Sequence, residues 1–332
     1  MAKTSVTSTD VAKLANVSQS AVSRTFTPGA SVSEETRDKV LAAAQQLGYR
    51  PNKLARSLIS GRSRIVGLVV AYLENHFYPL VIERLSRDLQ SHGYHVLLFM
   101  TEPGKQDEVI QEILQYQIDG VVLASVTLSS HIAEECAALG VPVVLFNRYI
   151  PDAQASSVTS DNVAGGYQLA RFFAEKGYQR IAYIAGHENS STNQDREQGF
   201  TQGLAESGLK IYRREVGRYL FEEAAEAARR LLAAGDYPDA VFIANDHMAF
   251  AVMDVIRGEF GLRIPEDIAV AGYDNVPEAG WAAYDLTTVE QPVAEMVTAA
   301  VEILLEQMEH KVVQPVHRVS PARLVVRGSV RN

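Results

Sequence analysis

The feature that most constrains the fold is an alternation of apolar runs and amphipathic stretches, which starts at Ile65. Such runs are typical of buried parallel strands, because helices cover both faces of the sheet they form. The alternation occurs in two successive rounds. We predict strands at Ile65–Ala71, Tyr94–Met100, Gly120–Ala124 and Val141–Phe146, then at Arg180–Ala185, Ala240–Ala244 and Ile268–Gly272. The pattern therefore predicts an α/β core of two doubly wound lobes, with a cleft where strand ends meet.

A different pattern precedes the core. Thr7–Phe26 predicts two short helices joined by a tight turn, and Val11, Leu14 and Ala15 form the buried stripe of the first. Ser18 is placed to cap the second helix. Its outward set is Gln19, Ser20, Ser23 and Arg24. Gln and Arg side chains form paired hydrogen bonds with base edges, so this helix is a candidate DNA reader. The alternative is a helical hairpin with a merely solvated polar face.

A third helix, capped by Ser33 and closed by Gly48, completes a compact head. Charge separates this head from the rest of the chain. Residues 1–64 carry ten Lys and Arg against four Asp and Glu, a net of +6, whereas the whole chain is at −9, which leaves −15 for the remainder. A basic head on an acidic body favours DNA contact through the head alone.

Residues 53–58 follow Pro51 and precede Gly61, and they are too few to form a stable helix alone. We interpret them as a hinge that orders only against DNA and a second copy of itself, with Leu58 as an apolar wedge. The alternative is a plain linker with an incidental leucine.

Polar and aromatic side chains follow several of the predicted strands. Aromatic faces suit the C–H side of a polyol ring, and amides, arginines and carboxylates suit its hydroxyls. Each residue also has a structural alternative, such as a helix cap, an interlobe ion pair or a core position. The strand-end candidates are Phe77, Tyr78, Asn147, Arg148, Asp161, Arg196, Asn245, Asp246 and Asp274.

The sequence lacks the motifs that mark several other classes of protein. The sequence contains no G-x-G, no phosphate loop, no H-E-x-x-H and no G-x-S-x-G, so we expect no enzyme, no catalytic residues and no cofactor. Its histidines do not cluster with acids at metal spacing, so we expect no metal. Cys136 is the single cysteine, and we find neither a secretory signal nor an apolar run long enough for a membrane span, so a cytoplasmic protein is expected.

Several longer segments carry a specific resemblance. They are TDVAKLANVSQSAVSRTF, VSEETRDKVLAAAQQLGYRPNKLARSL, SDNVAGG, AND at Ala244–Asp246, GYDN at Gly272–Asn275, LTTVEQP at Leu286–Pro292 and RLVVRGS. With these, the chain resembles the lactose-repressor/galactose-repressor (LacI/GalR) family of bacterial transcriptional regulators over essentially its whole length.

The resemblance implies a homodimer or tetramer whose paired heads bind a pseudo-palindromic operator. Gln19, Ser20 and Arg24 fall at positions where family members contact bases. Leu58 falls at the position of the leucine that family members insert into the minor groove. The sequence offers no heptad tail after Arg331, which favours the dimer. The expected DNA-contacting set is Thr7, Ser18, Gln19, Ser20, Ser23, Arg24, Asn52, Lys53, Ala55, Arg56 and Leu58.

The resemblance also implies a periplasmic-binding-protein-like core whose chain crosses between lobes near Asp161, Gln291 and Ser320. The expected parts are a head at 1–50, a hinge at 51–64, one lobe at 65–161 and 291–320, and a second lobe at 162–290 and 321–332. The implied effector-binding residues are Phe77, Tyr78, Asn147, Arg148, Asp161, Arg196, Phe221, Asn245, Asp274 and Gln291.

The effector is expected to be a sugar or sugar derivative, and the regulated genes to concern carbohydrates. Purine-binding relatives tend to carry an arginine where this chain has Ser190, which counts against a purine or nucleoside, the alternative effector. A transport-type sugar-binding protein is the other alternative, but it would need a signal peptide and no basic head. The effector is expected to shift the angle between lobes and thus the spacing of the two hinges. The sequence leaves open whether it induces or corepresses.

Overall fold

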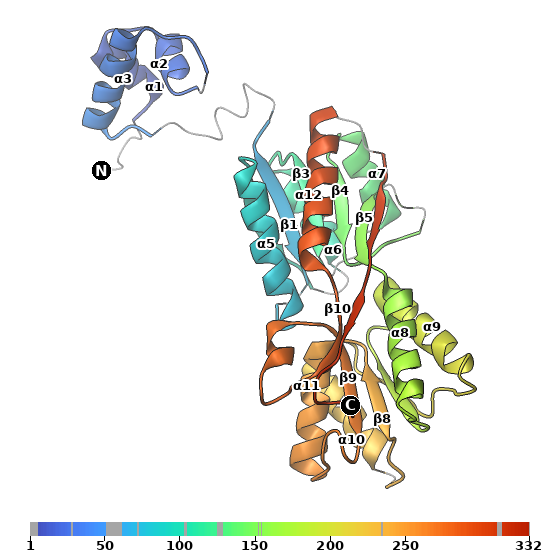
Figure 1. The fold of residues 1–332 in the computed structure, drawn as a ribbon. Helices are drawn as coiled ribbons and strands as arrows, with labels where there is room; N and C mark the ends of the chain where they lie inside the picture. Colours follow the sequence, from blue (N-terminus) through green and yellow to red (C-terminus); the bar gives the residue numbers. More distant parts are fainter. Residues whose placement is uncertain are drawn as a thin grey trace. The chain divides into compact units, whose positions relative to one another are not determined.

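A computed structural model describes residues 6–27, 29–50, 62–71, 73–102, 105–124, 129–151, 153, 155–233, 235–310 and 314–331. The chain divides into two compact units, Met1–Ser63 and Arg64–Asn332. The predicted architecture is confirmed: a head of helices precedes a core built on two largely parallel sheets (Figure 1). Among the described residues, no helix has the length and apolarity that crossing a bilayer requires.

The head consists of α1 (Ser8–Ala15), α2 (Gln19–Thr25) and α3 (Glu34–Leu47). Val11, Val22 and Val40 meet in its small core. One prediction is wrong: Leu14 is 46% exposed, and Ala12 takes its place in the buried stripe of α1. The first helix therefore packs through Val11, Ala12 and Ala15, because α2 and α3 both lie against that side.

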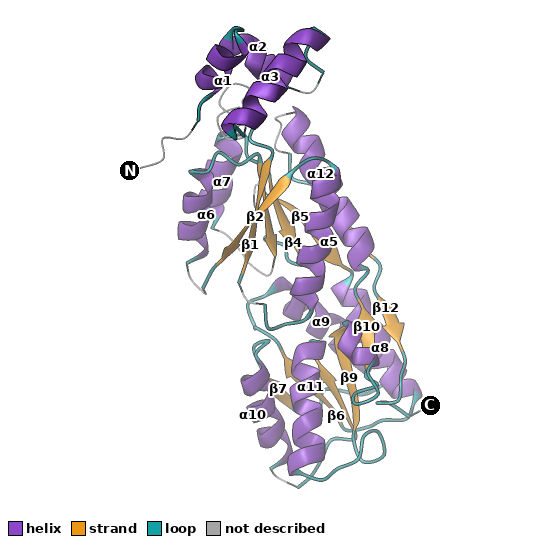
Figure 2. Ribbon diagram, turned by 90° about the vertical axis from the view of Figure 1, so that its left-hand side faces the viewer, coloured by secondary structure: helices purple, strands orange, loops and turns teal. Residues whose placement is uncertain are grey.

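The first lobe is built on a sheet with the strand order β11-β5-β4-β3-β1-β2. Successive residues of its strands point to opposite faces. Val122 and Val144 pack in the cluster that contains α5 and α12, whereas Val121 and Val143 pack in the cluster that contains α6 and α7. Figure 2 shows these two pairs of helices on either side of the sheet. The strands are β1 (Ile65–Val70), β2 (His95–Met100), β3 (Gly120–Ala124), β4 (Val143–Phe146), β5 (Ser156–Ser160) and β11 (His317–Ser320), and the helices are α5 (Phe77–Ser91), α6 (Gln106–Leu114), α7 (Ser130–Ala138) and α12 (Val293–His310).

The second lobe is built on a sheet with the order β12-β10-β9-β8-β6-β7, in which only the β10–β12 pair is antiparallel among the described strands. Its strands are β6 (Ile181–Ala185), β7 (Arg214–Val216), β8 (Ala240–Ile243), β9 (Ala269–Asp274), β10 (Thr287–Glu290) and β12 (Arg323–Val325). Its helices are α8 (Asn162–Glu175), α9 (Ser191–Ala205), α10 (Phe221–Leu232) and α11 (Asp246–Asp254), with a π turn at Val255–Glu259 and a 3-10 turn at Pro277–Gly280.

The chain passes between the lobes at three places: from β5 to α8, from β10 to α12 and from β11 to β12. Five strands were not predicted from apolar runs, because each is short and polar in part: β5 (SSVTS), β7 (REV), β10 (TTVE), β11 (HRVS) and β12 (RLV). α9 starts at Ser191, since the side chain of Ser190 accepts a hydrogen bond from the backbone of Asn193 and caps the helix.

Candidate functional site

The outward face of α2 is the candidate DNA-reading surface. Ala21, Val22 and Thr25 are buried in the head, so the four residues predicted to face outward are exposed. Gln19 donates to the hydroxyl of Ser8 at 2.9 Å, a bond within the head that a base would have to replace. Within the described part of the chain, no protein partner is found for the side chain of Arg24, which leaves its guanidinium available to a base or phosphate.

Two of the predicted DNA contacts serve as helix caps. Thr7 and Asp10 form a capping box at the start of α1, and the Ser18 hydroxyl accepts from the backbone of Ala21 at 3.2 Å. These bonds fix the turn between α1 and α2 and hence the direction of the second helix. The remaining predicted contacts lie outside the described residues: Asn52, Lys53, Ala55, Arg56 and Leu58.

In the core, the candidate site is organised around Arg196 of α9, which is only 2% exposed. Its Nε donates to Oδ1 of Asn162 at 2.8 Å, and its Nη1 donates to the carbonyl oxygen of Ala244 at 2.6 Å. Its guanidinium lies 3.7 Å from the ring centroid of Tyr273. A buried guanidinium held in this way has a fixed plane and direction.

Glycines allow α9 to bring Arg196 to this place. A side chain at Gly166 of α8 would overlap the backbone carbonyl of Arg196, and one at Gly165 would overlap the ring of Tyr273. Gly166 therefore lets α8 and α9 approach closely, and Gly165 makes room for the ring of Tyr273 beside the arginine.

Asp274 is the acidic partner of Arg196. Its Oδ1 lies 3.6 Å from Nη2 of Arg196 and accepts from Nε2 of Gln291 at 2.7 Å. Burial raises the pKa of Asp274 to about 6, although Arg196 and Gln291 both act to lower it. Gln291 in turn accepts from the hydroxyl of Ser160 at 2.9 Å, so strands β5 and β9 and the start of α12 join in one network.

Asn245 and Asp246 follow β8 but differ in role. Oδ1 of Asn245 caps α11 by accepting from the backbone of Met248. The carboxylate of Asp246 is fully buried and accepts from Thr288 at 2.6 Å and from the backbone of Val276 at 3.0 Å. Burial, and then the charge of Asp274, raise its pKa well above the ordinary range. Asp246 thus connects α11 to neighbouring strands.

Five buried polar atoms in this region have no hydrogen-bond partner among the described residues. They are Nη2 of Arg196, Nδ2 of Asn245, Nε of Arg148, Oδ1 of Asn147 and the hydroxyl of Tyr273. Asn147 and Asp274 also have positive φ angles, of 64° and 120°, at the ends of their strands. Unpaired buried donors and strained strand ends are features of ligand sites, because a bound molecule completes the hydrogen bonds.

The other predicted effector residues are three aromatic side chains, which are buried or partly buried, and Asp161, which lines a pocket. Phe77 and Tyr78 begin α5 and are buried, with ring centroids 5.3 Å apart, and Phe221 is partly buried beside the ring of His247. Asp161 caps α8 and lines a separate pocket whose lining contains none of Arg196, Asn245, Asp274 or Gln291. The structure therefore brings Arg196, Asp274 and Gln291 together directly, but not Asp161.

Three residues of the site were not predicted from the sequence. Asn162, Ser160 and Tyr273 bind or stack on the predicted residues, and the only sequence signal for them is that they lie in the SDNVAGG and GYDN segments. The bridges between lobes were also missed. Tyr149 donates from its hydroxyl to Asp195 at 3.1 Å and from its backbone to Ser191 at 3.2 Å. Nδ1 of His76 lies 3.5 Å from Glu278.

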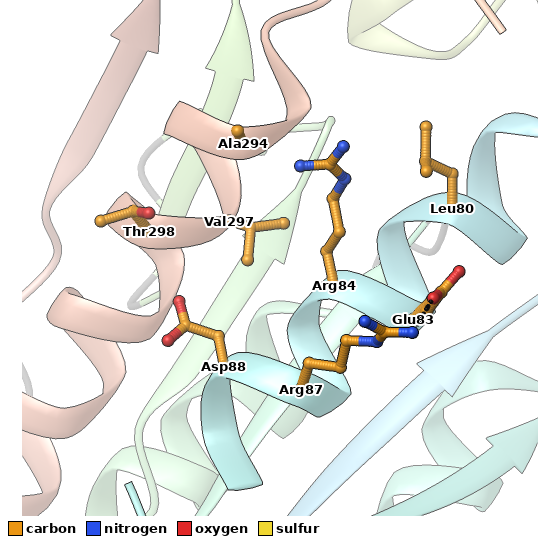
Figure 3. Close-up of a pocket in the computed structure, with 8 residues that line it drawn as sticks. All are labelled: Leu80, Glu83, Arg84, Arg87, Asp88, Ala294, Val297 and Thr298. Atoms are coloured by element: carbon orange, nitrogen blue, oxygen red, sulfur yellow. Dashed lines mark ion pairs between the residues drawn. The ribbon is translucent and has the colours of Figure 1, made fainter. Parts of the chain in front are cut away.

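A further groove lies between α5 and α12 and has a volume of about 580 Å³. Figure 3 shows Arg84 extending from α5 toward Ala294 of α12, and Arg87 in an ion pair with Glu83, 2.7 Å apart. Side chains of both charges line it, including Asp88, so the groove favours no particular class of ligand.

A helix-turn-helix head with an exposed polar face, joined to a two-lobed core with buried, unpaired donors, defines a ligand-controlled DNA-binding regulator. Comparisons with known proteins agree. Residues 7–52 match the model for bacterial regulatory proteins of the lacI family, and residues 170–330 match that for the periplasmic binding protein-like domain. The chain belongs to the lacI family.

Its relatives include HTH-type transcriptional repressors named PurR and CytR. PurR of Photobacterium profundum is 32% identical over 97% of this chain and 98% of that protein, and CytR of Escherichia coli is 31% identical over 99% and 97%. Among solved structures, a CelR–cellobiose complex is 32% identical with a TM-score of 0.74, over 98% of this chain and 99% of that one. A lac repressor dimer bound to operator and the anti-inducer ONPF is 26% identical with a TM-score of 0.89, over 99% and 100%.

The family membership fixes the general function. The protein is a DNA-binding transcriptional repressor with an effector-binding domain, and it is not an enzyme. It acts as a dimer on operator DNA under the control of a small molecule.

Proposed function

We propose that the effector is a sugar or sugar derivative bound around Arg196, in a repressor of carbohydrate-related genes. The observation that carries the proposal is the set of buried donors that make no hydrogen bond among the described residues, Nη2 of Arg196, Nδ2 of Asn245 and Nε of Arg148. Vicinal hydroxyls accept and donate at once, so a sugar would pair with these donors and with the carboxylate of Asp274. The cellobiose complex of the similar CelR supports this class of ligand.

Ser190 also favours a sugar over a purine. Its hydroxyl donates to the carbonyl oxygen of His187 and caps α9, so this position offers no cation to a base. We further propose Phe77, Tyr78 and Phe221 as apolar walls and Asn147 as a hydroxyl partner. Asp161 is the weakest member of the predicted set, because it lines another pocket.

For the head, we propose that Gln19, Ser20 and Arg24 contact base edges and that Thr7, Ser18 and Ser23 contact phosphates. Asn52, Lys53, Ala55 and Arg56 would follow the backbone toward the operator centre, where Leu58 would enter the minor groove. We retain residues 1–50 as the head, 51–64 as the hinge, and the two lobes with the boundaries given above. The protein would act in the cytoplasm, where operator DNA lies.

Control would pass through the contacts between the lobes. Tyr149 joins Ser191 and Asp195 after β4, and His76 joins Glu278 after β1. β3 lies between β1 and β4 in the sheet, so the two bridges are well separated. An effector that binds one lobe arrangement more tightly would shift the population of closed and open forms, and with it the spacing of the hinges.

The test is a ligand screen on the full-length dimer. Monosaccharides, disaccharides, nucleosides and purine bases are added separately, and thermal unfolding and affinity for a selected operator are measured. We expect a sugar to raise the melting temperature and change operator affinity. The Arg148→Gln variant should weaken that response, whereas Glu175→Gln, on the exposed side of α8, should not. A response to nucleosides or bases alone would overturn the sugar assignment, and no response to any class would overturn the proposed effector site.

A further inference from the structure

A pocket of about 560 Å³ lies where β5 crosses into α8, at the edge of the first lobe formed by β11. The first lobe contributes Tyr149, Ser157 and His317, the second lobe contributes Asp195 and Gln198, and Asp161 lies where the chain crosses between them. Its volume falls in the range of about 300–1,000 Å³ that is usual for small-molecule sites. Its lining includes Ser160 and Asn162, which hydrogen bond to Gln291 and Arg196, but not Arg196, Asn245, Asp274 or Gln291 themselves. The pocket therefore adjoins the proposed effector site without sharing those four side chains.

The charged side chains that line the pocket are all acidic among the described residues. Two carboxylates, Asp161 and Asp195, face the pocket, and no lysine or arginine occurs among its described lining residues. Ser157 and His317 hydrogen bond to each other at 2.8 Å and provide a polar wall. Ile150, Val163 and Val319 provide apolar surface next to the ring of Tyr149. Such a lining disfavours an anion and suits a cation with an apolar body.

The two carboxylates are only partly neutralised by the protein. Oδ1 of Asp161 accepts from the backbone of Ala164, and Oδ1 of Asp195 accepts from Tyr149. Burial raises the pKa of Asp195, although the hydrogen bond from Tyr149 and the charge of Arg196 act to lower it, and the negative charge of Asp161 adds to the rise. The second oxygen of each carboxylate has no hydrogen-bond partner within the described structure, and a positive charge between them would relieve their repulsion.

We propose that this pocket binds a small organic cation, with its ammonium group between Asp161 and Asp195 and its apolar body against Tyr149, Ile150 and Val163. The ligand would contact both lobes beside the bridge that Tyr149 makes to Ser191 and Asp195. Its affinity would therefore depend on the angle between the lobes, and it would act as a second control on the regulator, separate from the effector.

Benzylamine, which is cationic at pH 7.5, is the probe, with benzyl alcohol and benzoate as neutral and anionic analogues. Binding to the full-length dimer is measured by ligand-observed NMR and by calorimetry. We expect benzylamine to bind at least about tenfold more tightly than benzyl alcohol, since charge-assisted hydrogen bonds contribute more than neutral ones. Benzoate should bind more weakly still.

Variants test whether benzylamine binds in this pocket. Asp195→Asn retains an acceptor for Tyr149, and Asp161→Asn retains a helix cap, so both should fold and each should weaken benzylamine binding about tenfold. Glu175→Gln removes an equal charge from exposed α8 surface, and Phe221→Leu alters the proposed effector wall, and neither should change the affinity. Equal binding of amine and alcohol, or equal affinity of wild type and both Asp variants, would overturn the proposal. Loss in Phe221→Leu would place the amine in the effector site instead.

Discussion

The face of α2 and the site around Arg196 present polar side chains in opposite ways. In α2 the side chains are exposed and Arg24 is available to solvent, whereas in the core Arg196 is buried and held by Asn162 and Ala244. An exposed reading face costs little stability and is specified by helical periodicity alone. A buried site must satisfy its own polar groups first, so its residues support the fold as well as the ligand.

The largest expected effect follows from Arg196→Ala. It leaves the buried carboxylate of Asp274 with Gln291 alone, and breaking a buried ion pair in this way costs about 3–5 kcal/mol of unfolding free energy. Denaturant unfolding of the full-length protein measures this cost. Arg214→Ala is the control: Arg214 pairs with Glu188 and Glu197 near the surface, and its removal should cost less than about 1 kcal/mol. Equal losses would remove the distinction between buried and exposed sites.

A second effect concerns the head. Arg24→Ala should weaken binding to the selected operator by about 1–3 kcal/mol, roughly 5- to 150-fold, with little change in binding to unrelated DNA. Lys53→Ala, at a predicted phosphate contact, should instead weaken all DNA about equally and flatten the salt dependence. Titrations of operator and random duplexes at several salt concentrations provide the measurement. If both variants lost sequence preference equally, the proposed division between base and phosphate contacts would be wrong.

A third effect is a dependence of core stability and of effector binding on pH. The raised pKa of Asp274, about 6, means that the folded protein keeps this proton to a higher pH than the unfolded chain, so its contribution to stability falls as pH rises from about 4 to 6. A sugar that pairs with the ionised carboxylate should therefore bind more weakly below about pH 6. Calorimetric titration at pH 7.5 and 5.0 measures this, and Asp274→Asn should flatten the profile. An unchanged slope in that variant would assign the dependence to another group.

The smallest expected effect is that of Ser18→Ala. Loss of the cap on α2 should lower the stability of the head by about 1 kcal/mol, because the backbone of Ala21 loses its acceptor. Thermal unfolding followed in the head measures it, with Ser23→Ala as an exposed control on the same helix. A fall in the stability of the core instead would show that the two units do not unfold independently.

The comparison also explains how much was predictable. The outward face of α2 was predicted from helical periodicity. In α1, Leu14 was wrongly predicted to be buried, because Ala12 lies on the side that α2 and α3 cover. In the core, apolar runs located most strands, and strand ends then identified Arg196 and Asp274. The polar strand β5 was missed because it has no such run, and with it the hydrogen bond from Ser160 to Gln291.

The interlobe bridges could not be predicted for a related reason. Tyr149 and Asp195 are 46 positions apart, and neither lies in a patterned segment that would mark it. Their meeting depends on the angle between two sheets, which local sequence does not encode. The effector set came from the family resemblance and stays a prediction. Asp161 of that set lines a pocket with Asp195, while its neighbours Ser160 and Asn162 hydrogen bond to Gln291 and Arg196.

The three passages between the lobes have a consequence for biosynthesis. The helices of the head lie within the first 47 residues, so the head is able to fold while the rest is still being made. The first lobe, by contrast, obtains α12 from Val293–His310 and its edge strand from His317–Ser320, and the second obtains β12 from Arg323–Val325. A chain released near residue 290 would expose both the edge of β5 and one face of its sheet. Ribosome stalling late in the message would thus produce a DNA-binding head attached to an aggregation-prone body.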